Sequence, residues 1–226
     1  MTAGLFIAIE GGDGSGKGTQ SELLRYYASN TLGKHVLKVS FPRYGKPSAY
    51  YAGEYLNGAY GTADEVPADL ASLTYAIDRF AAKADIEAQL ALPDSIVIAD
   101  RYVASNLAHQ GTKFNDPTER HNFYERMLIT EYEVLGIPKP SMNIVLVMPT
   151  SFAQTNVDKK DIRLYTDKKR DIHEADASHL NRAKANYEEL CTLYPDEFIS
   201  VQCVDGNGAM RSIEEIQDEI QTILNL

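Results

Sequence analysis

The stretch that decides the fold reads Gly11-Gly12-Asp13-Gly14-Ser15-Gly16-Lys17-Gly18-Thr19. It follows a short apolar run, Leu5–Glu10, and precedes a run of helical character that begins at Gln20. A strand, a glycine-rich loop that contains a lysine, and a helix in this order are typical of a phosphate-binding loop. The glycines let backbone N–H groups point at phosphate oxygens, and the start of the helix adds partial positive charge. The stretch therefore predicts a polyphosphate site, the alternative being a glycine-rich turn without a ligand.

The lysine of the loop and the residues after it indicate which ligands to expect. Lys17 can reach the β- and γ-phosphates of ATP and follow their charge in the transition state, so we expect the whole loop to bind ATP. The next position, where a serine or threonine usually ligates Mg²⁺, is Gly18. Gly18 cannot ligate a metal through a side chain, which leaves Thr19 a role through water. We expect ATP as co-substrate and Mg²⁺ as cofactor.

The rest of the chain alternates short strands with longer helices. Several strand candidates are apolar at nearly every residue, which is typical of strands buried on both faces of a parallel sheet. The helices carry apolar residues at steps of three and four. One such set is Leu70, Leu73, Ile77, Phe80 and Ala84. The order predicts one domain over residues 1–226, a three-layer α/β/α fold of the P-loop NTP hydrolase type with a five-stranded parallel sheet. The predicted strands are Leu5–Glu10, His35–Phe41, Ser95–Asp100, Met142–Met148 and Phe198–Val204.

The overall charge limits the classes of partner. The 226 residues have a formal net charge of −10, whereas proteins that bind nucleic acid polymers usually present a basic surface, so such partners are not expected. Small anionic ligands are compatible with this charge, because a local group of Lys and Arg outweighs the global balance. The apolar run near the N-terminus is too short for a signal peptide or a membrane span. The two cysteines fit no metal spacing, and we expect a cytoplasmic protein with reduced thiols and no membrane partner.

A second polar element follows the strand Ser95–Asp100. In P-loop proteins a strand beside the loop strand ends in a carboxylate that helps to hold Mg²⁺ or its water shell, which makes Asp100 a metal candidate. Arg101 follows at once, and its guanidinium fork is suited to binding phosphate oxygens of donor and acceptor together. We predict catalytic roles for Lys17 and Arg101. The alternative for residues 100 and 101 is an ordinary surface pair at a strand end.

Several further motifs, in the right order, make the chain resemble the thymidylate kinase family from Phe6 to about Tyr194. The segment at residues 100–111 is the most specific of them, whereas the phosphate loop occurs in many families. The motifs are EGGDGSGKGTQ at Glu10–Gln20, FPRYG at Phe41–Gly45, the pair Asp78-Arg79, DRYVASNLAHQG at Asp100–Gly111 and RDIHEAD at Arg170–Asp176.

The resemblance implies an acceptor site for thymidine monophosphate (dTMP). Asp13 would meet the sugar 3′-hydroxyl and the metal shell, Tyr75 would stack on the base, and Arg79 would read the acceptor from the same helix face. The alternative for the last two is an exposed ring beside a surface salt bridge. Asn106 and Gln110 would hydrogen-bond near the base. The implied acceptor set is Asp13, Phe41, Pro42, Arg43, Tyr44, Tyr75, Arg79, Arg101, Ser105, Asn106, His109, Gln110 and His173.

Three further positions of this acceptor set carry an open alternative. In the turn that begins at Phe41, Arg43 would lie near the acceptor phosphate, but Phe41 itself is also compatible with plain core packing. His109 stands where many relatives have a tyrosine against the sugar, so the discrimination of deoxyribose from ribose would be looser or differently achieved; the alternative is a solvated ring that is neutral in effect. His173 also replaces a frequent tyrosine, which leaves its contact open.

A basic segment at about residues 158–171 is a candidate lid over ATP. It contains six basic residues, and positive charge there would cover the phosphates and exclude water. Arg163 and Arg170 are the predicted catalytic contacts of this lid. Four acids are mixed in, so the alternative is a solvated charged loop. Beyond the lid, the resemblance implies a segment that contacts the acceptor sugar and the metal. Glu174, which shares a helix face with Asp171, is its metal-shell candidate and joins Asp13 and Asp100.

The reaction implied by the resemblance is ATP + dTMP → ADP + dTDP, a step toward dTTP, by in-line transfer without a covalent enzyme intermediate. One rival is a kinase for another acceptor such as dUMP, AMP or thymidine. Another is a nucleotide-dependent switch or regulatory module, although the sequence has no NKxD motif of the kind that reads guanine in such switches. The resemblance also implies a homodimer.

Overall fold

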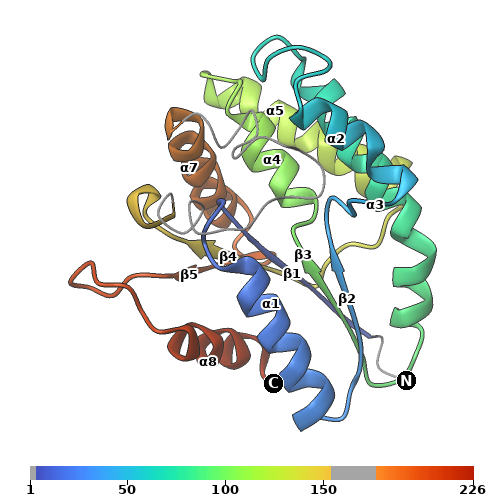
Figure 1. Cartoon of the computed structure of the whole chain (residues 1–226), viewed down its shortest axis with the longest axis vertical. Helices are drawn as coiled ribbons and strands as arrows, with labels where there is room; N and C mark the ends of the chain where they lie inside the picture. Colours follow the sequence, from blue (N-terminus) through green and yellow to red (C-terminus); the bar gives the residue numbers. More distant parts are fainter. Residues whose placement is uncertain (1–3, 154–176) are drawn as a thin grey trace.

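The computed structural model describes residues 4–153 and 177–226, and its five parallel strands form one sheet in the order β2-β3-β1-β4-β5 (Figure 1). This confirms the predicted five-stranded parallel sheet of a P-loop fold. The strand ends differ from the predicted ones by no more than two residues, since β2 stops before Phe41 and β5 stops before Cys203. The strands are β1 (Leu5–Gly11), β2 (His35–Ser40), β3 (Ser95–Asp100), β4 (Met142–Val147) and β5 (Phe198–Gln202).

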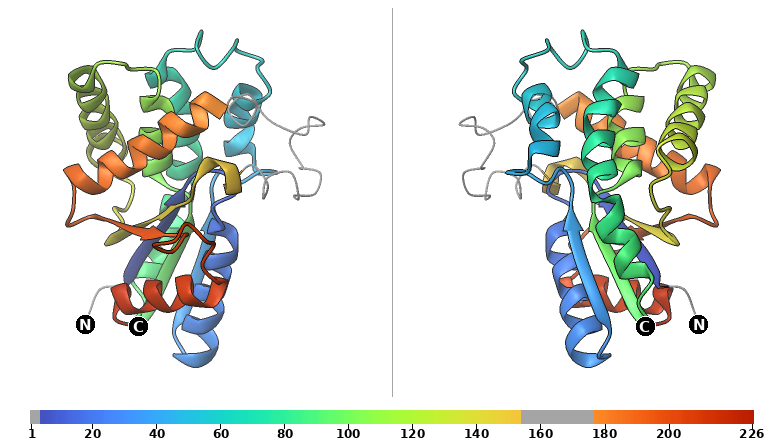
Figure 2. Two further views of the ribbon diagram at one scale, coloured as in Figure 1. Left: turned by 90° about the vertical axis from the view of Figure 1, so that its left-hand side faces the viewer. Right: turned by 90° about the vertical axis from the view of Figure 1, so that its right-hand side faces the viewer.

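Helices cover both faces of the sheet because its central strands are apolar on both sides (Figure 2). Along β1, Phe6 and Ala8 join the core beneath α3, α4, α5 and α7, whereas Ile7 and Ile9 join the core beneath α1 and α8. This alternation follows from the two-residue period of a strand. The helices are α1 (Lys17–Tyr26), α2 (Tyr50–Leu56), α3 (Ala68–Leu90), α4 (Val103–Gly111), α5 (Pro117–Leu128), α7 (Ala177–Leu193) and α8 (Ile213–Leu224).

Three short helical turns extend this framework. A π-helical turn, Tyr27–Thr31, continues α1, and another, Ile129–Val134, continues α5. A 3₁₀ turn, Pro47–Ala49, leads into α2. Within the described ranges 4–153 and 177–226, no helix is both long and apolar enough to span a bilayer.

The long helix α3 exposes its large apolar residues and buries its small ones. Leu70, Leu73, Ile77 and Phe80, from the stripe recognised in the sequence, are 53%, 41%, 44% and 49% exposed. The opposite face, which includes Ala71, Ala76, Ala82 and Ile86, is buried. Small residues on that face allow α3 to pack closely on its neighbours. The stripe is therefore a true helix face, and its four large side chains stay about half exposed.

An ion-pair cluster joins α5 to α7. Glu189 accepts hydrogen bonds from Nε and Nη2 of Arg120, both at 2.8 Å, and from the hydroxyl of Tyr124 at 3.1 Å. The hydrogen bonds from Arg120 are the main reason why the pKa of Glu189 falls from 4.5 to about 2.

Glu189→Gln should lower the free energy of unfolding by about 1 kcal/mol at pH 7, a small value because the pair is partly solvated. The folded pKa of Glu189 lies below the unfolded one, so its stabilisation is complete above about pH 4.5 and is lost as the pH falls through about 2. Urea unfolding at pH 7 and pH 3 should show the difference between the two proteins shrinking by more than half. An unchanged difference would contradict the role given to this ion pair.

Candidate active site

The loop between β1 and α1 needs glycine at two positions where a side chain would not fit. Gly11 has φ of +134°, and a Cβ there would lie 2.5 Å from the carbonyl oxygen of Leu146. Gly14 has φ of +80°, and its Cβ would lie 2.1 Å from the carbonyl oxygen of Ala153. Glycine adopts such conformations without the strain that other residues meet. The loop consequently lies close against the end of β4 and the turn that follows it.

A cavity of about 550 Å³ opens over this loop and the first turn of α1. Lys17 lines it and is only 6% exposed, with its Nζ donating to the carbonyl oxygen of Gly12 at 2.6 Å. Asp100 and Arg101 line the same cavity, as the sequence predicts for a site that handles phosphates. The other lining residues are Asp13, Gly14, Ser15, Gly16, Gly18, Thr19, Gln20, Met148, Met210, Arg211, Ile213 and Ile216.

Asp100 faces the start of α1. It ends β3 and lies opposite Ile9 of β1, so the end of β3 lies beside β1 two residues before β1 ends at Gly11. Its Oδ2 lies 3.4 Å from the position that a Cβ on Gly18 would take, which places the carboxylate next to the residue that follows Lys17. Across residues 4–153 and 177–226, no group of three or more His, Cys, Asp or Glu could hold a metal ion by itself. A cation here would need further ligands from phosphate oxygens or water.

Arg101 links the second strand end to the glycine-rich loop. Its Nη2 donates to Oδ1 of Asp13, and its Nη1 reaches Oγ of Ser105 at 3.3 Å. Burial is the largest single influence and works against the charged form, but the fields of Asp13, Tyr187, Asp100 and Glu10 together raise the pKa of Arg101. Arg101 has φ of +67°, a left-handed conformation that is rare for a long side chain. The turn after β3 thus aims a permanent positive charge at the loop.

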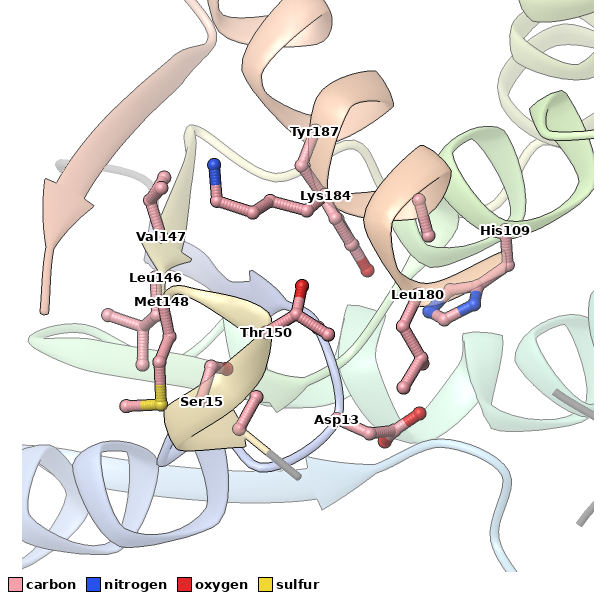
Figure 3. Close-up of a pocket in the computed structure, with 13 residues that line it drawn as sticks. Asp13, Ser15, His109, Leu146, Val147, Met148, Thr150, Leu180, Lys184 and Tyr187 are labelled. Atoms are coloured by element: carbon pink, nitrogen blue, oxygen red, sulfur yellow. The ribbon is translucent and has the colours of Figure 1, made fainter. Parts of the chain in front are cut away.

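A second hollow adjoins the loop on the side of α7. Figure 3 shows Asp13, His109 and Tyr187 at its edge, with the hydroxyl of Tyr187 pointing into it. Leu180 of α7 also lines it, as does Met148 after β4. Asp13 therefore borders both hollows, which is the position required of a group that meets two ligands.

The turn after β2 carries the predicted residues of the acceptor phosphate. Phe41 is 5% exposed, and the centre of its ring lies 5.6 Å from that of Tyr102, so Phe41 packs in the core while its role toward the acceptor stays a prediction. The peptide bond between Phe41 and Pro42 is cis. Arg43 is held by Asp78, whose Oδ1 accepts from its Nε at 2.9 Å and whose Oδ2 accepts from its backbone N–H at 2.6 Å. Tyr44 is partly buried and packs against the small apolar cluster that contains Tyr55.

Arg79 is buried in an ion pair that the sequence did not indicate. It is 2% exposed, and its Nε and Nη2 donate to the two carboxylate oxygens of Glu131 at 2.7 and 2.5 Å. Asn106 donates to the same carboxylate at 3.1 Å. The surface salt bridge considered as an alternative is therefore wrong for Arg79. Tyr75 lies on the same helix, and its ring forms a T-shaped contact with the ring of Tyr55, with the two ring centres 6.1 Å apart.

The remaining predicted acceptor residues on α4 are buried. Gln110 is 1% exposed and accepts a hydrogen bond from the hydroxyl of Tyr55 at 3.3 Å. His109 is 8% exposed, with Nε2 at 3.5 Å from Nη1 of Arg101 and Nδ1 at 3.2 Å from Nε2 of His179. The solvated alternative for His109 is therefore wrong, because the ring sits between Arg101 and His179.

Some predicted residues lie outside the described ranges, and some site residues were not predicted. The lid at 158–171 with Arg163 and Arg170, and the residues His173 and Glu174, belong to the first group. The second group includes Glu131 and the segment Met210–Ile213 beside the loop. It also includes Glu10, for which there was a signal, since an acid stands directly after the apolar run of β1.

Comparisons with known proteins agree on one family. The model of the family described as thymidylate kinase matches residues 9–220. The thymidylate kinase of Mycobacterium tuberculosis (strain H37Rv) is 34% identical over 197 residues, which cover 82% of this chain and 85% of that protein. The thymidylate kinase of Caulobacter vibrioides is 29% identical over 206 residues, 89% of each chain.

Solved structures of thymidylate kinases have the same fold. That of Candida albicans aligns with a TM-score of 0.72 at 19% identity, covering 99% of this chain and 92% of the other. That of Ehrlichia chaffeensis aligns with a TM-score of 0.65 at 19% identity, covering 99% of this chain and 100% of the other.

Gly14→Ala should lower the free energy of unfolding by about 2 kcal/mol or more, because the new Cβ meets the Ala153 carbonyl in a left-handed conformation. Gly12→Ala is the matched control, since a Cβ at Gly12 meets nothing within 4 Å, and it should cost less than about 1 kcal/mol. Urea unfolding of both variants measures this difference. Equal losses would show that the loop does not have the shape described.

Proposed function

Because the chain belongs to the thymidylate kinase family, we propose that its loop and the residues around it transfer the γ-phosphoryl group of ATP to dTMP, giving ADP and dTDP. The protein is an ATP:dTMP phosphotransferase of nucleotide biosynthesis. The observation that carries the assignment of the site is that Lys17, Asp100 and Arg101 line one cavity over a glycine-rich loop. Two strand ends thus supply the cations and carboxylates that a phosphoryl transfer needs.

On the donor side, we propose that backbone N–H groups of residues 11–19 and the start of α1 hold the ATP phosphates. Lys17 would leave the carbonyl oxygen of Gly12 and donate to the β- and γ-phosphates. The base of ATP would lie on Met210 and Ile213, which are 41% and 49% exposed at the cavity edge. Gln20 supports this edge by donating to the carbonyl oxygen of Ile213 at 3.0 Å.

The cavity fits Mg²⁺ as the expected cofactor. Asp100 offers a hard oxygen ligand beside Lys17, and Mg²⁺ usually binds through one or two carboxylates together with phosphates and water. When bound, Mg²⁺ neutralises charge on the transferred phosphoryl group. We propose that Asp100 holds it directly or through water and that the hydroxyl of Thr19, which lines the cavity, binds a water of its shell. Asp13 and Glu174 complete the proposed metal set.

On the acceptor side, we propose that Arg101 and Arg43 bind the phosphate of dTMP. Arg101 stands between the loop and α4, and the Asp78 carboxylate fixes the fork of Arg43 on the neighbouring turn. The two guanidinium groups would hold the attacking oxygen in line with the γ-phosphate, and such positioning supplies much of the rate. Asp13 would accept a hydrogen bond from the 3′-hydroxyl of the sugar.

The base of dTMP would lie among side chains of α3 and α4. Tyr75 offers a ring face, while Arg79 and Gln110 offer donors and an acceptor for the pyrimidine edge. The pairing of Arg79 with Glu131 fixes the plane of its guanidinium before any ligand binds. A ring and a pre-set fork at this position favour a small planar pyrimidine over a purine.

Steady-state ADP release with MgATP and a panel of acceptors tests this function. The value of kcat/KM should be highest for dTMP and at least about 100-fold lower for AMP. With dTMP as acceptor, Lys17→Met should lower kcat by about 100- to 1,000-fold. Ribothymidine monophosphate in the panel tests His109 as the group near the sugar. AMP as the preferred acceptor would overturn the acceptor assignment. ATP turnover that ignores every acceptor would favour a nucleotide switch.

We also propose that two copies of the chain form a dimer through the outer face of α3. Four large apolar residues in one exposed stripe exceed the scatter that is normal for a monomer surface. A two-fold axis across α3 would pack this stripe against itself. We further propose a cytoplasmic location, which the two free cysteines, Cys191 and Cys203, support.

The molar mass, measured by light scattering as the protein elutes from a size-exclusion column, tests the dimer. At about 10 µM the wild type should have twice the chain mass of 25.1 kDa, whereas Phe80→Glu should give a single chain because the charge would be buried in the contact. Leu23→Glu, at a residue 37% exposed on α1, is the control and should leave the mass unchanged. A wild type of single-chain mass would rule out the proposed dimer.

A further inference from the structure

Glu10 is a fully buried carboxylate directly behind the phosphate loop. It lies in β1 one residue before Gly11 and is 0% exposed. Its Oε1 accepts the backbone N–H of Tyr102 at 2.7 Å, and its Oε2 accepts the hydroxyl of Ser105 at 2.7 Å. The hydroxyl of Tyr187 approaches the same Oε2 at 3.3 Å. Both carboxylate oxygens thus accept hydrogen bonds, from the turn after β3, from α4 and from α7.

Keeping an acid at this place costs stability, which indicates a purpose other than packing. Burial raises the pKa of Glu10, while the hydrogen bond from Ser105 and the field of Arg101 act in the opposite direction. An apolar residue would fill the same space in β1 without this penalty.

The contacts of Glu10 hold a strained turn in place. Arg101 has φ of +67°, and residues in such conformations persist only where their surroundings fix them. Its own N–H donates to the carbonyl oxygen of Ile9 at 3.0 Å, and the next N–H, that of Tyr102, donates to Glu10. Two consecutive residues of β1 therefore fasten the two peptide groups on either side of Arg101.

A second route connects Glu10 to the guanidinium itself. Nη1 of Arg101 donates to Oγ of Ser105 at 3.3 Å, and the same hydroxyl donates to Glu10. Nη2 of Arg101 is bound by Asp13 on the loop. The guanidinium is thus held from two directions, by Asp13 in the loop and by Glu10 through Ser105.

We propose that Glu10 is a positioning residue for phosphoryl transfer, which fixes the turn and the side-chain direction of Arg101 through Tyr102 N–H and Ser105. It touches neither nucleotide, and it acts because Arg101 must stand at the right place before the phosphates arrive. The proposal rests on the function assigned to Arg101 above. Misplacement of a reacting or positioning group by about 1 Å can cost about 100-fold in rate.

Glu10→Gln keeps the length of the side chain and an acceptor for Tyr102 N–H, but its amide places a donor against Ser105. With MgATP and dTMP, kcat should fall by about 10- to 100-fold, while the KM for ATP should change by less than about threefold. Ser105→Ala breaks the same link without touching the buried charge, and should lower kcat by about 3- to 30-fold. The kcat of the double variant should be at most about twofold lower than that of Glu10→Gln, because both changes break the same connection.

Glu189→Gln is the control, since it removes a partly buried carboxylate on α7 that accepts from an arginine and a tyrosine, and its kcat should stay within twofold of the wild type. A wild type that does not phosphorylate dTMP would overturn the proposed function and, with it, the role of Glu10 that rests on it. With an active wild type, full kcat in Glu10→Gln, or independent multiplying losses in the double variant, would overturn the role of Glu10. If Glu10→Gln does not fold, Ser105→Ala decides, and full kcat in that variant would reject the proposal.

Discussion

The parallel pairing of β1 with β3 is the constraint on which the site depends. Ile9 lies opposite Asp100, so the chain leaves both strands at the same edge of the sheet, with β1 running two residues further than β3. One exit carries the glycine-rich loop with Asp13 and Lys17, and the other carries Arg101. A shift of the register would move Arg101 away from Asp13. Main-chain hydrogen bonds between two buried strands thus position the groups that this kinase uses for phosphoryl transfer.

Around this edge, ionic groups are held by other ionic groups before a ligand is present. Asp78 fixes Arg43, Glu131 fixes Arg79, and Asp13 with Glu10 fixes Arg101. Such buried pairs add little net stability, because desolvation offsets their attraction. They do give each guanidinium one orientation, which is what a site acting by position and charge requires.

The sequence was sufficient for features that depend on local pattern, and insufficient for those that depend on packing partners. The five strands and the loop followed from apolar runs and from the spacing of glycine and lysine. The apolar stripe on α3 was visible in the sequence as residues recurring at steps of three and four. Such spacing does not tell what covers the helix face, and Leu70 and Phe80 proved exposed. The pairing of Arg79 with Glu131 joins residues 52 apart and arises only where α3 meets the π-helical turn after α5. The approach of Met210 to the loop likewise depends on the connection from β5 to α8.

The most direct test of the account is calorimetric titration with an adenosine and a thymidine joined 5′ to 5′ by five phosphates, in the presence of Mg²⁺. This ligand fills the donor site and the acceptor site at once, and the account predicts one molecule bound per chain. Lys17→Met and Arg101→Ala should each weaken binding by about 100-fold or more, because each removes a charged contact to the phosphate bridge. Binding of equal strength in the wild type and both variants would contradict the claim that Lys17 and Arg101 face one polyphosphate from two strand ends.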